Sequence, residues 1–532
     1  MHLKPVFIKY VLFILVVYGV LKVLQVYIFT ALIESAFNGE SLSYLNTLIQ
    51  QHRSKAPEIR TLAYYSTEIN TYTNRLFLIF CLLFTFLVQL LKNNYKLLKD
   101  FIFDKRSPLT LSIFRIVLAS VLLLSDFPGK VDNVLNLDAS LISPPLGWNY
   151  SIINFLIKPE LISLFKITFV VSLIGTFFGF FTRTMIATAV ISGFFLMGIP
   201  QFFGKIDHYH LFWQCLVILM FCNSGASLSI DYWRSNKKLI NREEKFEYGI
   251  PIKLIMILLG LTYLFPGIWK FVFSGIEWAF SENLRNRLHS GWIGTNWTPF
   301  FRIDNHPILY QSMAFVTLLF ELAFLPALFY KKTRNILVLI ALGFHLSVFY
   351  LMKINFFGQI ALFLVFINWD RLAGIKSEIS FNSLNSKILY TKQKLLIGVG
   401  AFIILCNIIV GGLLINTWPY AVYPAFASIA TDTIPSILIE KNYSNDDRKV
   451  VIPLVSDHFK SELGNKLFPY LNNLYYQDGL SEEDVNVLVG HSLYEDNLNE
   501  VRIYKIRLSI DPDNTEHIFE KELLLYSSLS NN

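Results

Sequence analysis

The stretch KLLIGVGAFIILCNIIVGGLLIN, residues 394–416, decides the fold of this chain. It is charged only at its first residue, and a helix needs about 20 apolar residues to cross the hydrocarbon core of a bilayer. The stretch therefore predicts a membrane-spanning helix. The chain changes character after it: residues 417–532 hold 9 Lys/Arg against 18 Asp/Glu, whereas residues 1–416 hold 37 against 21. A basic membrane part and an acidic tail therefore lie in different environments.

Apolar runs of this kind recur along the whole membrane part. The chain is 54% hydrophobic and 16% charged, whereas a soluble domain carries about 25% charged residues. We expect an all-α polytopic membrane protein with about eleven transmembrane helices and a small α+β C-terminal domain outside the membrane. The expected domains are a two-span extension (1–106), a nine-span membrane domain (107–418) and a soluble acidic domain (419–532). The expected spans lie near 7–31, 76–92, 108–127, 161–181, 183–200, 209–227, 250–269, 308–330, 335–352, 355–369 and 394–416.

Basic loops predict the orientation. Short cytoplasmic loops carry an excess of Lys and Arg, and an odd number of spans places every basic loop of this chain on one side. The N-terminus is then cytoplasmic and the C-terminus outside. A composition rich in Phe, Ile, Asn and Lys favours a bacterial inner membrane. The basic loops are 92–106, 234–245, 331–334 and 371–394.

The outer segments have patterns of their own. The loops 128–160 and 270–307 are rich in Trp, Pro and Gly. We interpret them mainly as an aromatic belt in the headgroup layer, with a re-entrant loop as the alternative. In the tail, a lid, a partner-docking surface or a packing cap would all fit the pattern. Its expected elements are strands at 449–453, 501–510 and 517–526, a helix at 458–476 and a turn at 511–514.

Three ionisable residues fall at one expected depth inside the membrane. Arg115, Glu321 and His345 each lie about eight to ten residues from the inner end of a span, or about 12 to 15 Å deep at 1.5 Å per residue. Buried charges are costly and mark functional sites by default. We expect an ion pair between Arg115 and Glu321 with His345 beside it, serving either a site or a purely structural tie between helices.

A second group is expected at the outer boundary. Lys166 begins one span, and Lys205 lies between two others, just before Trp213. Burial in a dry aromatic pocket would lower the pKa of Lys205 and make it usable as a base; the alternative is a lysine that extends to the headgroups. His208 and His210 flank Asp207, a spacing that makes a poor metal site on a helix, so we expect no metal.

Several short motifs carry a family resemblance. Each is weak alone, but in order they resemble the horizontally transferred transmembrane (HTTM) domain shared by vitamin K-dependent γ-carboxylases and bacterial relatives. The resemblance covers about 107–418. The motifs are Ser107-Pro108 through Arg115, Ile142 to Trp148, Gly204-Lys205 with nearby histidines, Ser227 to Asp231, Phe320 to Phe324, and Phe344-His345-Leu346.

The resemblance implies an activity. In the carboxylases a lysine on the lumenal side deprotonates vitamin K hydroquinone, and oxygenation then yields a stronger base that abstracts a glutamate γ-proton before CO2 adds. Lys205 looks like that lysine. The lysine-to-histidine spacing is shorter here, the tail is far shorter, and no clear propeptide-binding region is present. These differences argue against carboxylation of peptide glutamates and leave a site for a quinone-like or lipid-like ligand.

Two functions of different classes remain open. The first is a quinol-dependent oxidoreductase or carboxylase-like enzyme with Lys205, His208 and His210 at its catalytic site and a quinol such as reduced vitamin K as cofactor. The second is a non-catalytic membrane module that binds lipid, or a protein partner through 419–532. A transporter is disfavoured, since no internal repeat is evident. Nucleic acid is not expected as a partner, because the basic residues are scattered.

Overall fold

The structure is a computed structural model of the chain, and its described part divides into two units. Unit 1 comprises Met1–Lys96 with Ile268–Trp278, and unit 2 comprises Leu97–Gly267 with Ala279–Asn532. Most of the structure is helical, with a small sheet near the C-terminus. The residues described are 5–54, 59–92, 98, 101–102, 104–125, 131, 142–203, 209–295, 297–375, 391–421, 426–443, 449–453, 475, 498–514 and 518–528.

Unit 1 is built on a helix pair with an aromatic seam. Tyr10 and Phe13 of the first helix pack on Phe84 of α4, with ring centroids 6.2 and 4.9 Å apart. Arg75 of α4 donates hydrogen bonds to the carbonyls of Val272 and Phe273, which ties the 268–278 segment to this pair. The elements are α1 (Pro5–Leu24), the π-helix η1 (Gln25–Phe29), α2 (Thr30–Phe37), α3 (Ser43–Ser54) and α4 (Leu62–Lys92).

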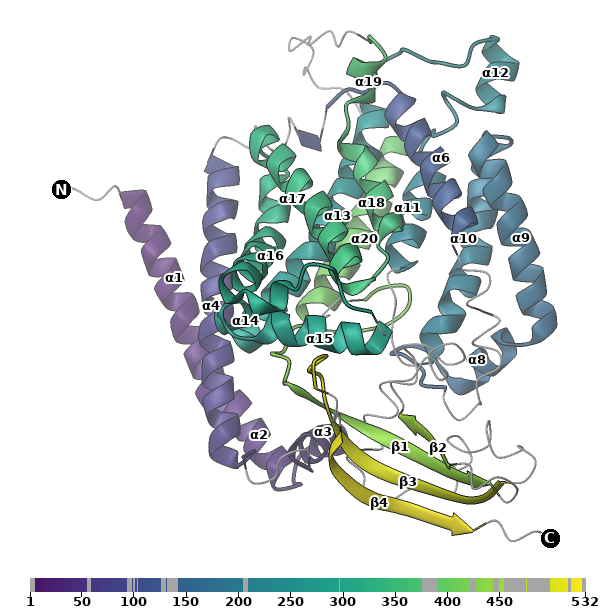
Figure 1. The fold of residues 1–532 in the computed structure, drawn as a ribbon. Coiled ribbons are helices and arrows are strands. Elements are labelled where there is room, and N and C mark those ends of the chain that lie inside the picture. The colour runs from purple at the N-terminus through teal and green to yellow at the C-terminus, as the bar shows by residue number, and fades with distance from the viewer. Residues whose placement is uncertain are drawn as a thin grey trace. The chain divides into compact units, whose positions relative to one another are not determined.

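Unit 2 holds the remaining helices, most of them around a main apolar core, with a smaller cluster of buried side chains around Trp292 of α15. The core is a continuous cluster of buried side chains from α6, α9, α10, α11, α13, α16 and α20. In Figure 1, α12 and α19 lie at one end of these helices, and α8 and α15 lie at the opposite end. The elements are α6 (Leu109–Leu124), α8 (Tyr150–Leu156), α9 (Pro159–Phe178), α10 (Thr182–Gly198), η3 (Ile199–Phe202), α11 (Tyr209–Met220), α12 (Ile230–Asn236), α13 (Phe246–Ser274, within unit 2 as far as Gly267), α14 (Glu277–Phe280), α15 (Asn283–Thr295), η4 (Ile303–Asn305), α16 (Pro307–Ala327), α17 (Lys331–Met352), α18 (Phe357–Leu362), η5 (Phe363–Phe366), α19 (Trp369–Leu372) and α20 (Thr391–Gly412).

Eight helices of the described residues are long and apolar enough to cross a membrane. The chain is therefore a multi-pass membrane protein. Three of the expected spans form shorter apolar helices, Leu109–Leu124, Tyr209–Met220 and Phe357–Phe366, which fall below the roughly 20 residues of a full crossing. The expected count of eleven is not confirmed, and the orientation, which depends on it, stays a prediction.

The C-terminal sheet confirms the expected strands and adds one. Four antiparallel strands lie in the order β2-β1-β3-β4. Ile506 and Leu508 form a small core with Leu438, and Tyr504 packs against it, as the alternation of apolar residues predicts. The expected helix at 458–476 lies outside the described residues except at Tyr475. The strands are β1 (Thr433–Tyr443), which was not expected, β2 (Lys449–Pro453), β3 (Leu498–Ser509) and β4 (Ile518–Ser528).

Candidate functional site

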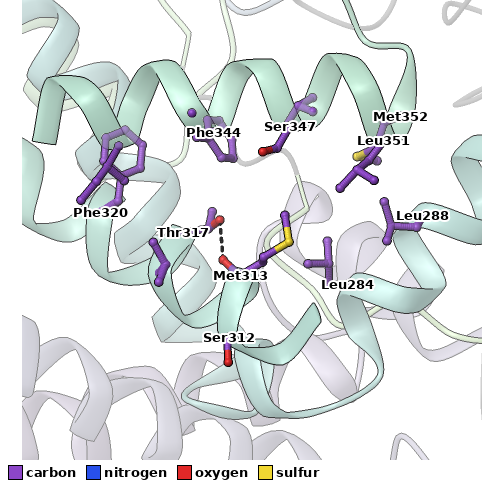
Figure 2. A pocket seen from close by; sticks show the side chains of 14 residues that line it. Leu284, Leu288, Ser312, Met313, Thr317, Phe320, Phe344, Ser347, Leu351 and Met352 are labelled. Atoms are coloured by element: carbon purple, nitrogen blue, oxygen red, sulfur yellow. Dashed lines mark hydrogen bonds between the residues drawn. The ribbon is translucent and has the colours of Figure 1, made fainter. Parts of the chain in front are cut away.

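An apolar cavity of about 330 Å³ lies between α15, α16 and α17. We call it the α15–α17 cavity. Figure 2 shows Phe320 toward one end, Leu288 and Met352 toward the other, and Met313 and Ser347 between them. Its volume lies at the lower end of the range of about 300–1,000 Å³ that is typical of small-molecule sites.

The lining suits a hydrocarbon better than a polar molecule. The Thr317 hydroxyl donates to the carbonyl of Met313, 2.9 Å away and one helical turn back, so it needs no partner from a ligand. Val316 and Gly343 line the cavity and are also exposed, so the cavity opens at the surface of the helices. An apolar chain could therefore enter it from the surrounding lipid.

A buried polar cluster lies behind the cavity wall. The Tyr263 hydroxyl and His345 Nε2 are 2.6 Å apart in a hydrogen bond whose direction depends on the tautomer. Glu321 is also buried and within electrostatic range of Tyr263. A side chain on Gly267 would place its Cβ 2.9 Å from that of Glu321, so glycine permits the close approach of α13 and α16.

Aromatic rings enclose this cluster. Phe320, Phe324 and Phe363 pack around Tyr263 with ring centroids 4.9, 5.0 and 6.2 Å from its ring. Phe344 packs against His345 at 5.2 Å. Phe320 and Phe344 also line the α15–α17 cavity. These two rings therefore stand between the apolar cavity and the Tyr263–His345 pair.

Arg115 lies in a different site, and the expected ion pair with Glu321 is wrong. Its guanidinium donates to the carbonyls of Ser224 and Leu228 at 2.8 and 2.5 Å, and its side chain is fully buried. Gly179, with φ of 65°, closes α9 directly against it. Carbonyl oxygens of the loop after α11 therefore accept the hydrogen bonds of Arg115, and the carboxylate within electrostatic range of it is Asp231 rather than Glu321.

The outer-boundary residues are only partly described. Lys205, Asp207 and His208 lie outside the described residues, so their predicted roles are untested. His210 lies in the first turn of α11, buried, beside a small cavity of about 10 Å³ that Thr262 and Asn407 also line.

That small cavity is separate from the α15–α17 cavity in its lining residues. Neither cavity is lined by Glu321 or His345, so the expected grouping of His210 with these two residues stays a prediction. Lys166 is half-buried in α9, two turns inside the helix rather than at its start. The described residues contain no group of three His, Cys, Asp or Glu side chains suited to a metal.

Two tryptophans, Trp148 and Trp418, connect distant segments of unit 2. Phe203 pairs with Ser143 in an isolated bridge. Trp148 donates its indole N–H to the carbonyl of Trp418 at 3.1 Å, and Trp418 donates to Phe194 at 2.8 Å. Trp148 thus joins the chain just before α8 to the segment after α20, and it does not act as a free headgroup anchor.

The part of the loop 270–307 that belongs to unit 2, from Ala279 onward, is likewise folded into that unit. Trp292 of α15 is only 1% exposed and donates to the carbonyl of Leu351 at 2.6 Å. The interpretation of this loop as an aromatic belt is therefore wrong at Trp292. The Trp- and Gly-rich stretch forms α15, whose Leu284 and Leu288 close one end of the α15–α17 cavity.

A network of charges connects this loop to the C-terminal sheet. Arg302 donates to both oxygens of Asp304, at 2.9 and 2.8 Å, and to both oxygens of Asp513, at 2.9 and 2.7 Å. Asp513 lies in the predicted turn between β3 and β4. Burial acts to raise the pKa of Asp304, but hydrogen bonds from Arg302 and His289 hold it below its usual value. The hydrogen bond from Arg302 likewise lowers the pKa of Asp513.

Sequence reasoning missed several of these residues. Tyr263 carries no charge and gave no indication of its pairing with His345. Lys253 falls inside an expected span, so the criterion that selected Arg115 would also have found it. Arg302 and Asp304 lie in a loop, where no pattern distinguishes them from solvated charges.

The motifs that carry the family resemblance are mostly structural ties. Ser107 donates from its backbone N–H and its hydroxyl to Asp370. Asp231 accepts from the backbone N–H of Phe181 at 3.0 Å and from that of Thr182 at 2.7 Å. These contacts fix the ends of helices that are far apart in the sequence.

Comparison with known proteins identifies the family of the chain. No curated protein and no solved structure matches the chain. The family model of the HTTM domain, which is found in vitamin K-dependent γ-carboxylase, matches residues 103–370. The match begins just before the expected boundary at 107 and covers about half of the chain. The chain therefore belongs to the HTTM domain family.

Proposed function

We propose that this chain binds an elongated apolar ligand of the quinol type in the α15–α17 cavity. The observation that carries the proposal is the cavity itself: about 330 Å³, lined mostly by apolar side chains, and open at Val316 and Gly343. An isoprenoid or acyl chain matches this lining, because burial of each methylene contributes about 0.8 kcal/mol. The polar end of the ligand would then face the wall formed by Phe320 and Phe344.

The chemical step of the proposal rests on the family. In the resembling carboxylases the base is a lysine at the position of Lys205, and we propose the same role here. The eleven spans expected from the sequence would place this lysine at the outer face. The Tyr263–His345 pair would be the second proton-handling group, since a histidine and a phenol in hydrogen-bond contact can exchange a proton. The activity proposed is oxidation of the quinol by molecular oxygen, in which two electrons and two protons pass to O2 to give quinone and hydrogen peroxide, rather than peptide carboxylation.

Gly343 offers a direct test of the binding site. A Cβ at this position would meet nothing within 4 Å, so Gly343→Leu fills the cavity without backbone strain and replaces a poor helix former. Titration of the purified chain with a short-chain quinone, followed by tryptophan quenching, should show binding weakened by about tenfold or more.

The matched control is Gly398→Leu. Gly398 also lies in an apolar helix with nothing near its Cβ, but it does not line the cavity. Equal affinity in both variants would reject the α15–α17 cavity as the binding site.

The enzymatic part is tested separately with Lys205→Ala. Oxidation of a reduced quinone should be lost while binding persists. Turnover that survives this substitution removes Lys205 from the mechanism. Binding without turnover even in the unmodified chain would instead favour a non-catalytic lipid-binding module.

A further inference from the structure

A second, smaller cavity lies where several basic loops of unit 2 meet. Arg106 pairs with Lys245 through backbone hydrogen bonds of 3.3 and 2.9 Å. Beside this pairing, a cavity of about 10 Å³ is lined by Arg106, Thr110, Lys253 and Arg334 together with apolar side chains. We call it the Arg106–Arg334 cavity. The residues that line it come from the start of α6, from α13 and from α17.

Three of these lining residues are cationic. Lys253 is only 3% exposed, and Arg106 and Arg334 both lie within electrostatic range of it. The carboxylate that contacts the group is Asp104, whose Oδ2 lies 2.8 Å from Arg106 Nη2 and 3.3 Å from Lys253 Nζ.

Two further carboxylates lie near the cavity, but among the described residues neither contacts its cations directly. Glu244 is within electrostatic range of Arg106, but no ion pair with it is found among the described contacts. Asp370 accepts the hydrogen bonds of Ser107, which is neutral and leaves the charge of the carboxylate in place. Among the described contacts, Arg334 has no ion pair with a carboxylate, so it is the cation of this group that an anion could still pair.

Two donors at the cavity have no acceptor within the protein. The Thr110 hydroxyl is buried with no hydrogen-bond partner among the described contacts, and Thr110 is only 2% exposed. Arg334 Nε is likewise buried without an acceptor. Buried donors of this kind are rare in folded proteins and indicate a missing water or ion.

We propose that the Arg106–Arg334 cavity binds an oxygen of a phosphate group. The three cations supply the charge, and Thr110 Oγ1 and Arg334 Nε supply hydrogen bonds that no protein atom takes. The volume of about 10 Å³ holds one oxygen or one water, so the rest of the phosphate would remain at the mouth. Arg106 and Asp104 are 21% and 34% exposed there.

The position suits an anionic lipid. Basic pockets between membrane helices on the cytoplasmic side bind phospholipid headgroups, and the loops that meet here are the ones predicted to be cytoplasmic. Free phosphate offers the same oxygen chemistry from solution. This site is independent of the α15–α17 cavity, so either proposal can fail without the other.

The test uses the full chain purified into nanodiscs and into detergent. In nanodiscs, the melting temperature is compared between pure phosphatidylcholine and a mixture with phosphatidylglycerol. In detergent, inorganic phosphate is titrated against chloride at equal ionic strength. Stabilisation by phosphatidylglycerol alone identifies a lipid headgroup, and stabilisation by inorganic phosphate identifies free phosphate.

Two substitutions remove the proposed contacts singly. Arg334→Gln and Thr110→Val should each weaken the apparent affinity for the stabilising anion, Arg334→Gln by about tenfold, because a hydrogen bond to a charged group contributes about 1.5–3 kcal/mol. Thr110→Val keeps the side-chain shape and is expected to fold. If Arg334→Gln fails to fold, Thr110→Val still tests the proposal.

The matched control is the double variant Lys331→Gln/Lys332→Gln. Both lysines are exposed and lie on the same helix as Arg334, so the double variant removes more surface charge than Arg334→Gln does. It should leave the stabilisation nearly unchanged. The proposal is overturned if neither anion stabilises the chain, or if this double variant abolishes the effect as fully as Arg334→Gln.

Discussion

Arg115 and His345 are both buried ionisable groups on membrane helices, yet they belong to different kinds of site. Arg115 reaches two backbone carbonyls of the loop after α11. His345 reaches a side chain, Tyr263, and lies among aromatic rings beside an apolar cavity. Burial of an ionisable side chain therefore does not distinguish a structural contact between helices from a functional site. The partner of its hydrogen bonds, backbone carbonyl or side chain, does distinguish them.

The largest effect on stability is expected for substitution of Arg115, if Arg115 has a structural role. Arg115→Met removes two charge-assisted hydrogen bonds, each contributing about 1.5–3 kcal/mol, and leaves the Ser224 and Leu228 carbonyls without their donor. We expect the free energy of unfolding to fall by about 3 kcal/mol or more. The measurement is thermal unfolding in detergent together with the yield of monodisperse protein. If the Arg115→Met variant is stable but no longer binds quinone, Arg115 belongs to the quinone-binding site and its role is not structural.

An intermediate effect is expected at the Tyr263–His345 pair. Tyr263→Phe leaves a buried imidazole nitrogen without its partner, at a cost of about 1–3 kcal/mol. Replacing both partners with apolar groups, as in Tyr263→Phe/His345→Leu, should recover much of that loss.

Comparison of stability with activity then sharpens the contrast between the two regions. A double variant that regains stability but has no turnover assigns the pair to chemistry. A double variant that regains both stability and turnover shows that the pair has a packing role. Tyr263–His345 and Arg115 would then both be structural, and the contrast between them would be wrong.

The smallest effect is expected at Asp513. This carboxylate is 66% exposed, and exposed ion pairs contribute about 0.2–1 kcal/mol. Because Arg302 lowers the pKa of Asp513, the contact stabilises docking above the ordinary carboxyl pKa and is lost as pH falls through the lowered value. The protection of 498–514 against hydrogen exchange, expressed relative to the intrinsic rate at each pH, should therefore fall in acid. At neutral pH, Asp513→Asn should lower this protection slightly, and unchanged protection in both cases would contradict the assignment.

The long apolar helices could be predicted from the sequence because apolar runs of this length indicate them, whereas the polar helices α3 and α15 carry no such signal. The strands 449–453 and 501–510 were equally accessible, since alternation marks a half-buried strand. The site was less accessible. Expected depth placed Arg115, Glu321 and His345 at one level, but depth says nothing about the direction in which a side chain points around its helix. Arg115 faces the loop after α11, and Glu321 faces α13.

Contacts between distant segments could not be predicted either, because a single sequence does not show where a side chain points. Trp292 and Trp148 look like interfacial anchors in a single sequence, and only tertiary packing shows that their indoles donate to Leu351 and Trp418. The Arg302–Asp513 contact joins positions that no local pattern relates.

Helix α15 has one consequence for the whole of unit 2. One face closes the α15–α17 cavity through Leu284 and Leu288, while Asn286 and Arg287 donate to the carbonyls of Ala430 and Ser428, in the segment that leads into the sheet. A ligand that binds more tightly at one position of α15 therefore also changes how strongly the sheet binds to α15. By thermodynamic linkage, binding of the sheet changes the affinity for the ligand by the same factor. A chain cut after α20 would lose this reciprocity together with its tail.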